Sequence, residues 1–328
     1  MNSQVIKSFG MELKKFKKIW GIYLCDTDQG IKMVQPVRIK EERIWFQHSA
    51  KEYIYQQGFT QFSRFHLSEQ QTPYHVQGRT IYVMEDWEEG TELDFTNFDD
   101  VKKATKLLGT FHAASKGMRP MQEAETVSAI SIVPTQMKRR TKEIQRFRRR
   151  IYEHGRLSDF DLLFIRYYSY YYGLALDALK RLEKPVCSQW IRTFKENEYL
   201  CHGNFIHHNI LTGRKGLWLK DFSHCSYHIP LYEFACFVNK TMQKSGFDAD
   251  RALEMFQIYK TYMEHGDGLE ELFFSLLIFP ERFLKYCNLY YNQRRSNPST
   301  KYLEKMTELV DTQQEHEQFI MEIKKELL

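Results

Sequence analysis

The chain contains little glycine and little proline, 16 and 8 residues among 328. Because these two residues dominate turns, their scarcity favours helices over a sheet-rich sandwich or barrel. The sequence also has no long hydrophobic run: a membrane helix needs about 18 or more uncharged apolar residues, and the longest stretch, residues 272–280, is half that length. We therefore expect no membrane span.

Cysteine is sparse and shows no close pairing. The six cysteines are at positions 25, 187, 201, 225, 236 and 287, and no two of them form a C-x-x-C pair. Residues 1–18 lack the apolar segment of a secretory signal peptide. Together these absences predict reduced thiols in a protein that is synthesised in the cytoplasm without a signal peptide.

An excess of charge of one sign is also missing, since 47 basic and 42 acidic residues give a net charge of +5. This value does not by itself indicate a nucleic-acid partner, and no aromatic RNA-binding motif supports one. Basic residues do gather at positions 138–150, where eight of thirteen are lysine or arginine. On a helix, Ile144 and Phe147 would face inward. The cations would then form a solvated face or a site for an acidic or phosphorylated ligand.

The sequence has enough apolar residues, 42%, for a sizeable core, and its length suggests two domains or lobes. In the first ninety residues we expect strands at 20–27, 31–39, 62–67, 73–76 and 80–87, with one helix at 41–57. After Gly90 helical periodicity dominates. We therefore predict an α+β chain with a small β-rich lobe at residues 1–89 and a large helical lobe at residues 90–328.

One segment, residues 201–239, interrupts the helical pattern with a loop and a short hairpin. His202-Gly203-Asn204, Asn209-Ile210-Leu211 and Asp221-Phe222 follow one another in it. This series resembles the H-G-D-x-x-x-x-N-I-L … D-F motif of the aminoglycoside phosphotransferase and choline kinase superfamily, which has a protein-kinase-like fold. Within that superfamily the chain resembles the spore coat kinase-like proteins of the CotS type. The cues are residues 53–59, the EDWEEG phrase at 85–90, FHAAS at 111–115 and the basic segment that follows.

The resemblance implies a bilobal kinase-like fold in which residues 1–89 form a nucleotide-type lobe and residues 201–222 the catalytic-type loop. It implies ATP and Mg²⁺ as cofactors, since carboxylate and amide oxygens suit this metal. Asn209 and Asp221 take the places of its ligands. The backbone at Met84, Glu85 and Trp87 would contact the adenine.

Two motif positions depart from the family pattern. Asn204 stands where the family has its catalytic aspartate, after the motif histidine His202, and an amide cannot accept a proton from the substrate hydroxyl. Loss of a general base typically costs about 10²–10⁴ in rate. Gln35 stands at the place of the nucleotide-anchoring lysine, so it can donate a hydrogen bond to phosphate but carries no charge. Residues 26–30, where a glycine-rich loop was sought, are acidic.

These losses together indicate a catalytically degenerate kinase (a pseudokinase) with a structural or binding role and residual nucleotide binding. The alternative is an active ATP-dependent phosphotransferase that acts on a hydroxyl or amine of a small molecule. The resemblance further implies other spore coat proteins as partners, and the coat of the mature spore of a spore-forming bacterium as the location.

Two clusters admit further interpretations. Histidines and cysteines gather at positions 201, 202, 207, 208, 224, 225 and 228. Their spacing matches no common zinc pattern, so a zinc site is the weaker interpretation. Tyrosines at 167, 168, 170, 171 and 172 fit packing and an interface, because tyrosine buries its ring and keeps its hydroxyl hydrated. If these tyrosines were exposed in a coat, they could be cross-linked by oxidation.

Overall fold

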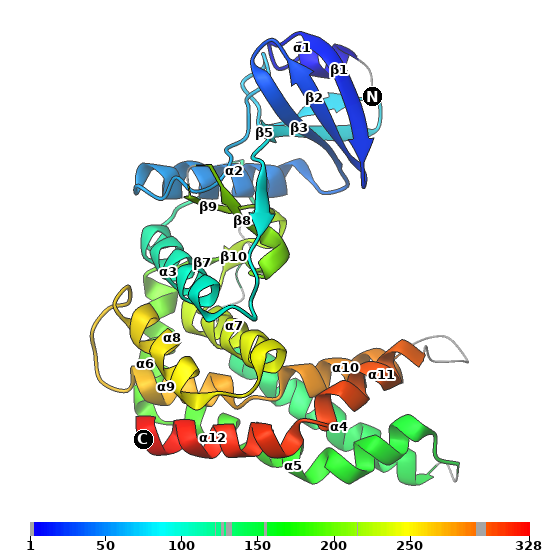
Figure 1. Ribbon diagram of the computed structural model, residues 1–328, viewed down its shortest axis with the longest axis vertical. Helices are drawn as coiled ribbons and strands as arrows, with labels where there is room; N and C mark the ends of the chain where they lie inside the picture. The colour runs from blue at the N-terminus through cyan, green and yellow to red at the C-terminus, as the bar shows by residue number, and fades with distance from the viewer. Residues whose placement is uncertain are drawn as a thin grey trace. The chain divides into compact units, whose positions relative to one another are not determined.

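The computed structural model describes residues 3–121, 123–125, 128, 133–153, 156–214, 216–292 and 300–328. The chain divides into two compact units, one of residues 1–128 with 197–227 and one of residues 129–196 with 228–328 (Figure 1). The catalytic-type loop thus belongs to the same unit as the N-terminal strands. The lobe boundary at residue 89 stays a prediction.

The first unit contains a five-stranded antiparallel sheet of order β1-β2-β3-β5-β4. Its strands are β1 (Leu13–Ile19), β2 (Ile22–Thr27), β3 (Gly30–Val37), β4 (His75–Gln77) and β5 (Thr80–Asp86). One face packs on α1 (Ser3–Lys7) through a cluster that includes Val34 and Met84. The other face packs on α2 (Glu41–Gln56), where Ile44 contacts Val83. Successive side chains of a strand point to opposite faces, which explains this division.

The strand predictions for this unit were partly wrong. Strand β1 was not predicted, and the first turn of the sheet is Trp20-Gly21, where φ is positive at both residues (46° and 92°). Such a two-residue turn fits the twist of a hairpin. The turn between the predicted strands 20–27 and 31–39 is confirmed: Asp28 and Gln29 connect β2 and β3. The predicted strand at 62–67 is absent: of these residues, only Phe65 forms a bridge, with Glu85.

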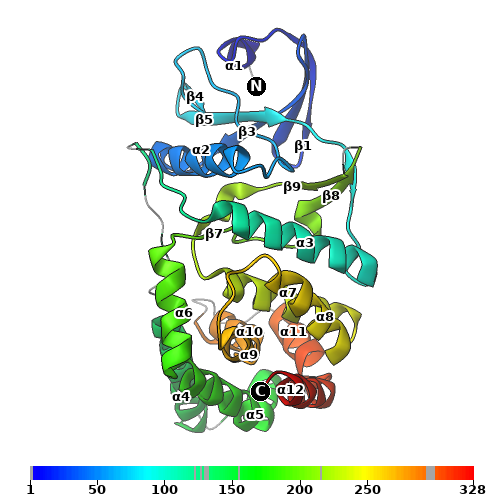
Figure 2. The same ribbon diagram turned by 90° about the vertical axis from the view of Figure 1, so that its left-hand side faces the viewer.

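The remaining elements of this unit support the catalytic-type loop. They are β6 (Gly90–Glu92), α3 (Phe98–Ser115), β7 (Leu200–Cys201), η2 (His207–Asn209), β8 (Ile210–Gly213), β9 (Gly216–Leu219), η3 (Phe222–His224) and β10 (Ser226–Tyr227). Strands β6, β8 and β9 form a small antiparallel sheet. Figure 2 shows α2 lying between the five-stranded sheet and the β8–β9 hairpin. Helix α2 therefore contributes side chains to both.

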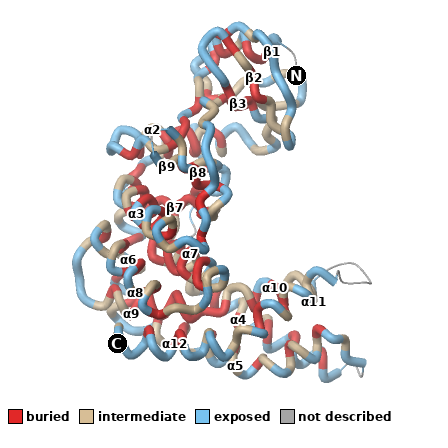
Figure 3. Tube along the Cα trace, viewed as in Figure 1, coloured by how far each residue is buried: buried red, intermediate tan, exposed pale blue. Residues whose placement is uncertain are grey.

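The second unit is helical in the residues that the structure describes. Its helices are α4 (Val133–Glu153), α5 (Asp159–Leu182), α6 (Pro185–Glu196), α7 (Pro230–Ser245), α8 (Ala249–Lys260), α9 (Leu269–Leu277), α10 (Glu281–Tyr291), α11 (Thr300–Val310) and α12 (Gln313–Leu327). Helix α9 packs against α5, α6, α7 and α12, and its side chains are buried on almost every face (Figure 3). The longest apolar run is thus the centre of a helical core. No helix within the described residues is long and apolar enough to cross a membrane.

The basic segment 138–150 lies on α4 and faces as predicted, with Ile144 and Phe147 buried. Many of its cations have partners in the same unit: Lys138 pairs with Glu183, and Arg148 lies over the ring of Tyr168. These contacts favour a structural role over a ligand site, because a paired cation offers less charge to a ligand.

The tyrosine cluster on α5 packs inside the second unit. Tyr168 and Tyr171 are buried, and Tyr167, Tyr170 and Tyr172 are half-buried. The hydroxyl of Tyr170 shares a hydrogen bond of 2.6 Å with Nδ1 of His316. The packing interpretation accounts for Tyr168 and Tyr171, and cross-linking of the half-buried tyrosines stays a prediction.

Candidate functional site

The hairpin predicted from residues 210–220 forms as β8 and β9, and it carries the motif residues at its two ends. His202 and Asn204 precede it, Asn209 stands at its entry and Asp221 at its exit. All four lie in the first unit. The structure therefore brings the predicted motif residues together.

His202 holds the loop closed. Its side chain is completely buried, and Nε2 lies 3.0 Å from the carbonyl oxygen of Lys220. The backbone N–H of Asn204 donates to Nδ1 at 3.3 Å. Since Nδ1 accepts, Nε2 carries the proton and donates to Lys220, which describes a neutral imidazole. His202 is thus a positioning residue that ties the start of the loop to the end of the hairpin.

Gly203 is required between these two residues. Its φ is +80°, a conformation that side-chain-bearing residues rarely adopt. A Cβ atom here would lie 2.4 Å from the backbone oxygen of His224. The close approach of residues 203 and 224 brings Asn204 near Asp221.

The side chains of Asn204 and Asp221 form a direct hydrogen bond. The amide Nδ2 of Asn204 donates to Oδ2 of Asp221 at 3.1 Å, and Nδ2 of Asn209 donates to the backbone oxygen of Asn204 at 2.9 Å. An aspartate at 204 would place two carboxylates in contact, which costs free energy unless a cation lies between them. The amide therefore removes the base and neutralises the contact in one change.

Asp221 adopts the left-handed conformation, with φ of 63°. Its Oδ1 accepts from the hydroxyl of Ser223 at 2.6 Å. Burial raises the pKa of Asp221, but the hydrogen bonds from Ser223 and Asn204 outweigh it and hold this pKa below its usual value. Asp221 is thus a carboxylate at neutral pH, and with the amide oxygen of Asn209 it offers the oxygen ligands that Mg²⁺ prefers.

A cavity of about 480 Å³ opens beside this carboxylate within the first unit. Its size is that of a small-molecule site. Residues of β3, α2, β5 and the hairpin line it: Met33, Gln35, Pro36, Val37, Arg38, Ile39, Gln47, Lys51, Phe65, Val83, Glu85, Asn209, Lys220, Asp221, Phe222 and Ser223. Gln35 and Glu85 therefore reach the cavity together with the metal-ligand candidates.

Met84 and Trp87 have different surroundings. Met84 is fully buried on the opposite face of the sheet, and its backbone oxygen accepts a hydrogen bond from the N–H of His66. Trp87 lines a second hollow of about 390 Å³ with residues of β1 and β2, and its N–H donates to the oxygen of Ile31. The carbonyl oxygen of Met84 and the N–H of Trp87 therefore already form hydrogen bonds within the chain, which an adenine at this strand would have to share or replace.

The second hollow lies on the same face of the sheet as the cavity. Leu24 pairs with Met33 across β2 and β3, and opposite residues in an antiparallel pair share a face. Leu24 lines the hollow and Met33 lines the cavity. Lys15 and Lys17 also line the hollow. Sequence reasoning missed these two cations because it did not predict β1.

The functional residue that sequence reasoning missed altogether is Lys51 on α2. Its side chain is 1% exposed, and Nζ donates to Oε1 of Glu85 at 2.5 Å and to the backbone oxygen of Ser63 at 2.9 Å. It also lies 4.2 Å from the centre of the Phe65 ring. Burial raises the pKa of Glu85 although Lys51 opposes this shift. A lysine at helical spacing from the inward-facing Ile44 was the available signal.

Protein kinases place this ion pair the other way round, with a lysine on strand β3 and a glutamate on the following helix. Here Gln35 stands on the strand and Lys51 on the helix, and the glutamate is on β5. Arg43, also on α2, donates to the backbone oxygens of Ser223 and Cys225. Helix α2 thus holds the segment after Asp221 by direct contacts.

The histidine-rich part of the loop forms a surface hydrogen bond. His208 Nδ1 lies 2.5 Å from Oε2 of Glu92, and His207 lies close enough to complete a three-ligand group with them. Glu92 and His208 are well exposed, so this arrangement is adequately explained as a charged surface contact.

Comparison with known proteins agrees with this geometry. The family described as "Spore coat putative kinase YutH" matches residues 2–323. Spore coat protein S of Bacillus subtilis (strain 168) is 21% identical over 309 residues, which are 94% of this chain and 87% of that protein.

Two solved structures share the fold. An aminoglycoside phosphotransferase from Alicyclobacillus acidocaldarius superposes with a TM-score of 0.87 at 15% identity, over 100% of this chain and 96% of that chain. A spectinomycin phosphotransferase in complex with ADP and spectinomycin superposes with a TM-score of 0.60 at 12% identity, over 92% and 90%. The fold is therefore that of aminoglycoside phosphotransferases, and the chain belongs to the spore coat YutH family of kinase-like proteins.

Proposed function

We propose that this chain is a kinase-fold component of the spore coat that has lost phosphoryl transfer and retains a weak nucleotide site. The contact between the Asn204 amide and the Asp221 carboxylate supports this proposal most directly. It fills the place of the catalytic base with a group that cannot take a proton.

No other side chain of the cavity replaces the base. Of the described residues that line it, only Glu85 and Asp221 carry carboxylates. Glu85 is bonded to the ammonium group of Lys51, and Asp221 is the metal-ligand candidate. A hydroxyl or amine substrate placed here would find no unengaged carboxylate to accept its proton.

The cation that should anchor phosphate is engaged as well. Gln35 is neutral, and the Lys51 ammonium group already bonds Glu85 and the backbone of Ser63. Phosphoryl transfer depends mainly on positioning and charge stabilisation. The two positions at which the family has its base and its anchoring lysine therefore carry the neutral amides Asn204 and Gln35, and the cations that remain in the described cavity wall beside Lys51 are Arg38 and Lys220.

Weak nucleotide binding has its own support. The hollow beside Trp87 combines an aromatic ring and the apolar Leu24 and Ile31 with the cation Lys17. Such a combination suits a base and its phosphates. Lys15 also lines the hollow and pairs with Asp26 at 3.6 Å, and Glu89 adds a second carboxylate, so any phosphate binding here would be weak. In the cavity nearby, Asp221 and Asn209 would hold Mg²⁺, which would supply charge neutralisation of the phosphates.

A turnover assay tests the loss of catalysis. Wild type should hydrolyse Mg-ATP no faster than buffer, and Asn204→Asp combined with Gln35→Lys should raise the rate measurably. Adding Asp221→Asn to that double variant should abolish the gain. Hydrolysis or substrate phosphorylation by wild type at about 1 s⁻¹ or more, an ordinary enzyme rate, would show that the alternative, an active phosphotransferase, is right.

Calorimetry with Mg-ATP tests the nucleotide site separately. Lys15 and Lys17 of β1 line the hollow beside Trp87, whereas Lys14 and Lys18 of the same strand do not. K15Q/K17Q should weaken binding about tenfold, and the matched variant K14Q/K18Q should leave it unchanged. Absence of heat and of a thermal shift at millimolar Mg-ATP would end the nucleotide claim and leave the purely structural role.

The location in the coat and the partnership with other coat proteins rest on family membership. Immunogold labelling of mature spores tests them, with a strain that lacks the protein as control. Label confined to the core, or equal in both strains, would contradict a coat role.

A further inference from the structure

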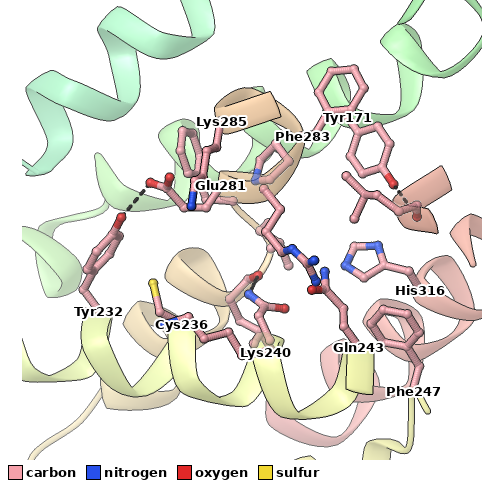
Figure 4. Close-up of a pocket in the computed structure, with 17 residues that line it drawn as sticks. Tyr171, Tyr232, Cys236, Lys240, Gln243, Phe247, Glu281, Phe283, Lys285 and His316 are labelled. Atoms are coloured by element: carbon pink, nitrogen blue, oxygen red, sulfur yellow. Dashed lines mark hydrogen bonds between the residues drawn. The ribbon is translucent and has the colours of Figure 1, made fainter. Parts of the chain in front are cut away.

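The second unit contains a cavity of about 180 Å³ that belongs to none of the motifs above (Figure 4). Side chains from α5, α7, α10 and α12 surround it in the figure. Its wall residues are Tyr171, Tyr232, Cys236, Asn239, Lys240, Gln243, Phe247, Leu277, Ile278, Phe279, Pro280, Glu281, Arg282, Phe283, Lys285, Leu309 and His316.

One wall is a single face of α7. Tyr232, Cys236, Lys240 and Gln243 are spaced four, four and three residues apart, which places them one above another on the helix. The opposite wall is α10, which contributes Glu281 and Lys285. Cations therefore reach the cavity from both helices.

The charges of the cavity do not balance. Lys240, Arg282 and Lys285 line it, and within the described part of the chain none of them forms an ion pair with a carboxylate. The one carboxylate in the wall, Glu281, is bonded to Arg140 and to the hydroxyl of Tyr232. Lys240 and Lys285 are exposed where they line the cavity and Arg282 is half-buried, so the solvent-facing part of its wall carries an excess of positive charge.

The other polar groups of the wall do not offset this charge. Burial lowers the pKa of His316 to about 4, so the ring is neutral at pH 7. Burial raises the pKa of Cys236 to about 12, so this thiol stays protonated. Arg282 uses Nε and Nη2 to donate to Tyr286, which leaves other guanidinium N–H groups for a ligand.

A buried acceptor adds a second requirement. Oε1 of Gln243 is inaccessible to solvent and has no hydrogen-bond partner in the structure. Buried polar atoms without partners are uncommon, and each costs free energy until a donor satisfies it. Gln243 lines the cavity, so a rotation of its side chain brings this oxygen to an O–H or N–H group of a ligand, which would supply that donor.

We propose that this cavity binds a small organic anion: one ring, one carboxylate or phosphate group, and one hydrogen-bond donor. The ring matches the space, since an apolar cavity of about 150 Å³ holds benzene. The anionic group matches Lys240, Arg282 and Lys285, and the donor matches Gln243. The volume of about 180 Å³ is smaller than the 390 Å³ of the hollow beside Trp87, so a single-ring ligand fits this cavity better than a complete nucleotide does.

The test uses the full-length protein and 4-hydroxybenzoate as probe, followed by calorimetry and thermal shift. Benzoate lacks the donor and 4-hydroxybenzamide lacks the charge. We expect 4-hydroxybenzoate to bind one to one, benzoate to bind severalfold more weakly, and 4-hydroxybenzamide to bind at least tenfold more weakly. Equal binding of the charged and uncharged compounds, or no binding of any at about 10 mM, overturns the proposal.

Variants locate the site. R282Q and K240Q/K285Q should each weaken 4-hydroxybenzoate about tenfold. The control K324Q/K325Q removes two exposed cations from α12, outside the cavity wall, and should leave affinity unchanged. If the control weakens binding as much as K240Q/K285Q does, the attraction is non-specific and the proposal fails.

A measurement on the wild-type protein tests the same site without relying on a variant that folds. Cys236 is partly exposed, whereas the other five cysteines are buried. Methyl methanethiosulfonate should modify Cys236 more slowly when 4-hydroxybenzoate is present, as read by peptide mass spectrometry. Unchanged modification at a saturating ligand concentration places the ligand elsewhere and overturns the assignment.

Discussion

Replacing Lys51 by methionine is the most direct test of the electrostatics of the cavity that Lys51, Glu85 and Asp221 line. The Lys51 side chain is 1% exposed and that of Glu85 is 14% exposed, so solvent screens their contact little. Methionine keeps most of the volume but leaves the Glu85 carboxylate without its cation. Breaking a buried ion pair by removing one partner costs about 3–5 kcal/mol of the free energy of unfolding.

This cost translates into a large thermal shift. A loss of 1 kcal/mol lowers the melting temperature by about 2–4 °C for a unit of this size, so K51M should melt about 6–20 °C below wild type. The double variant K51M/E85L removes both charges and should recover most of the loss, because an apolar pair has no desolvation cost. K106M, a matched change at an exposed lysine of α3, should shift melting little.

The same pair predicts a pH dependence with a definite sign. The pKa of Glu85 is raised in the folded state, so the folded chain holds this proton more tightly than the unfolded chain does. The protonated Glu85 carboxyl therefore adds to the free energy of unfolding at a pH below its unfolded pKa. This contribution is lost as the pH rises through the folded pKa. Without Lys51 the folded pKa rises further, so the deficit of K51M should grow from pH 5 to pH 8.

Thermal and urea unfolding at pH 5, 6.5 and 8 measure these effects. A K51M deficit equal to that of K106M, or one that does not change with pH, would refute the reasoning. Failure of E85L to restore K51M would also count against it, because the loss would then come from packing.

Three further predictions concern the loop. Asn204→Asp alone should lower the melting temperature by a few degrees in chelator and regain it with Mg²⁺, as thermal shift will show, because two carboxylates then meet at Asp221; wild type, which has one carboxylate there, should respond less to the metal. Arg43→Ala should let iodoacetamide reach the buried Cys225, detected by mass spectrometry, since Arg43 holds its backbone oxygen; unchanged labelling would contradict that role. Gly203→Ala should lower soluble yield and melting temperature strongly because its Cβ has no space, whereas Gly246→Ala, which has open space, should cost less.

The parts of the site that the sequence predicted are those with local causes. The hairpin of β8 and β9 was predicted because turn residues and apolar residues alternate at short range. Strand β1 was missed because its sequence, LKKFKKI, contains four lysines among seven residues and no apolar alternation. It is an edge strand, and exposed lysines are a common way to protect such an edge from unwanted pairing.

The features of the site that could not be predicted depend on contacts between residues far apart in the sequence. Lys51 is held by its ion pair with Glu85, which is thirty-four residues away in the sequence. Helical periodicity places a lysine on the inward face of the helix but does not predict which residue it contacts. The predicted contact of adenine with the backbone at residues 84–87 stays a prediction, but the strand separates the side chains of these residues. On a strand they alternate, so Glu85 reaches the cavity while Met84 is buried behind the sheet.

The departures from the kinase pattern compensate one another. In an active kinase, bound metal ions neutralise the charge that gathers around the nucleotide phosphates. Here each carboxylate of the cavity has a partner within the chain: Lys51 for Glu85, and Asn204 with Ser223 for Asp221. Both carboxylates are therefore hydrogen-bonded within the chain without nucleotide or metal, although burial still raises the pKa of Glu85. Restoring the aspartate at 204 alone should therefore make the chain less stable than it is now, since it recreates the repulsion without the ligands that an active site uses to relieve it.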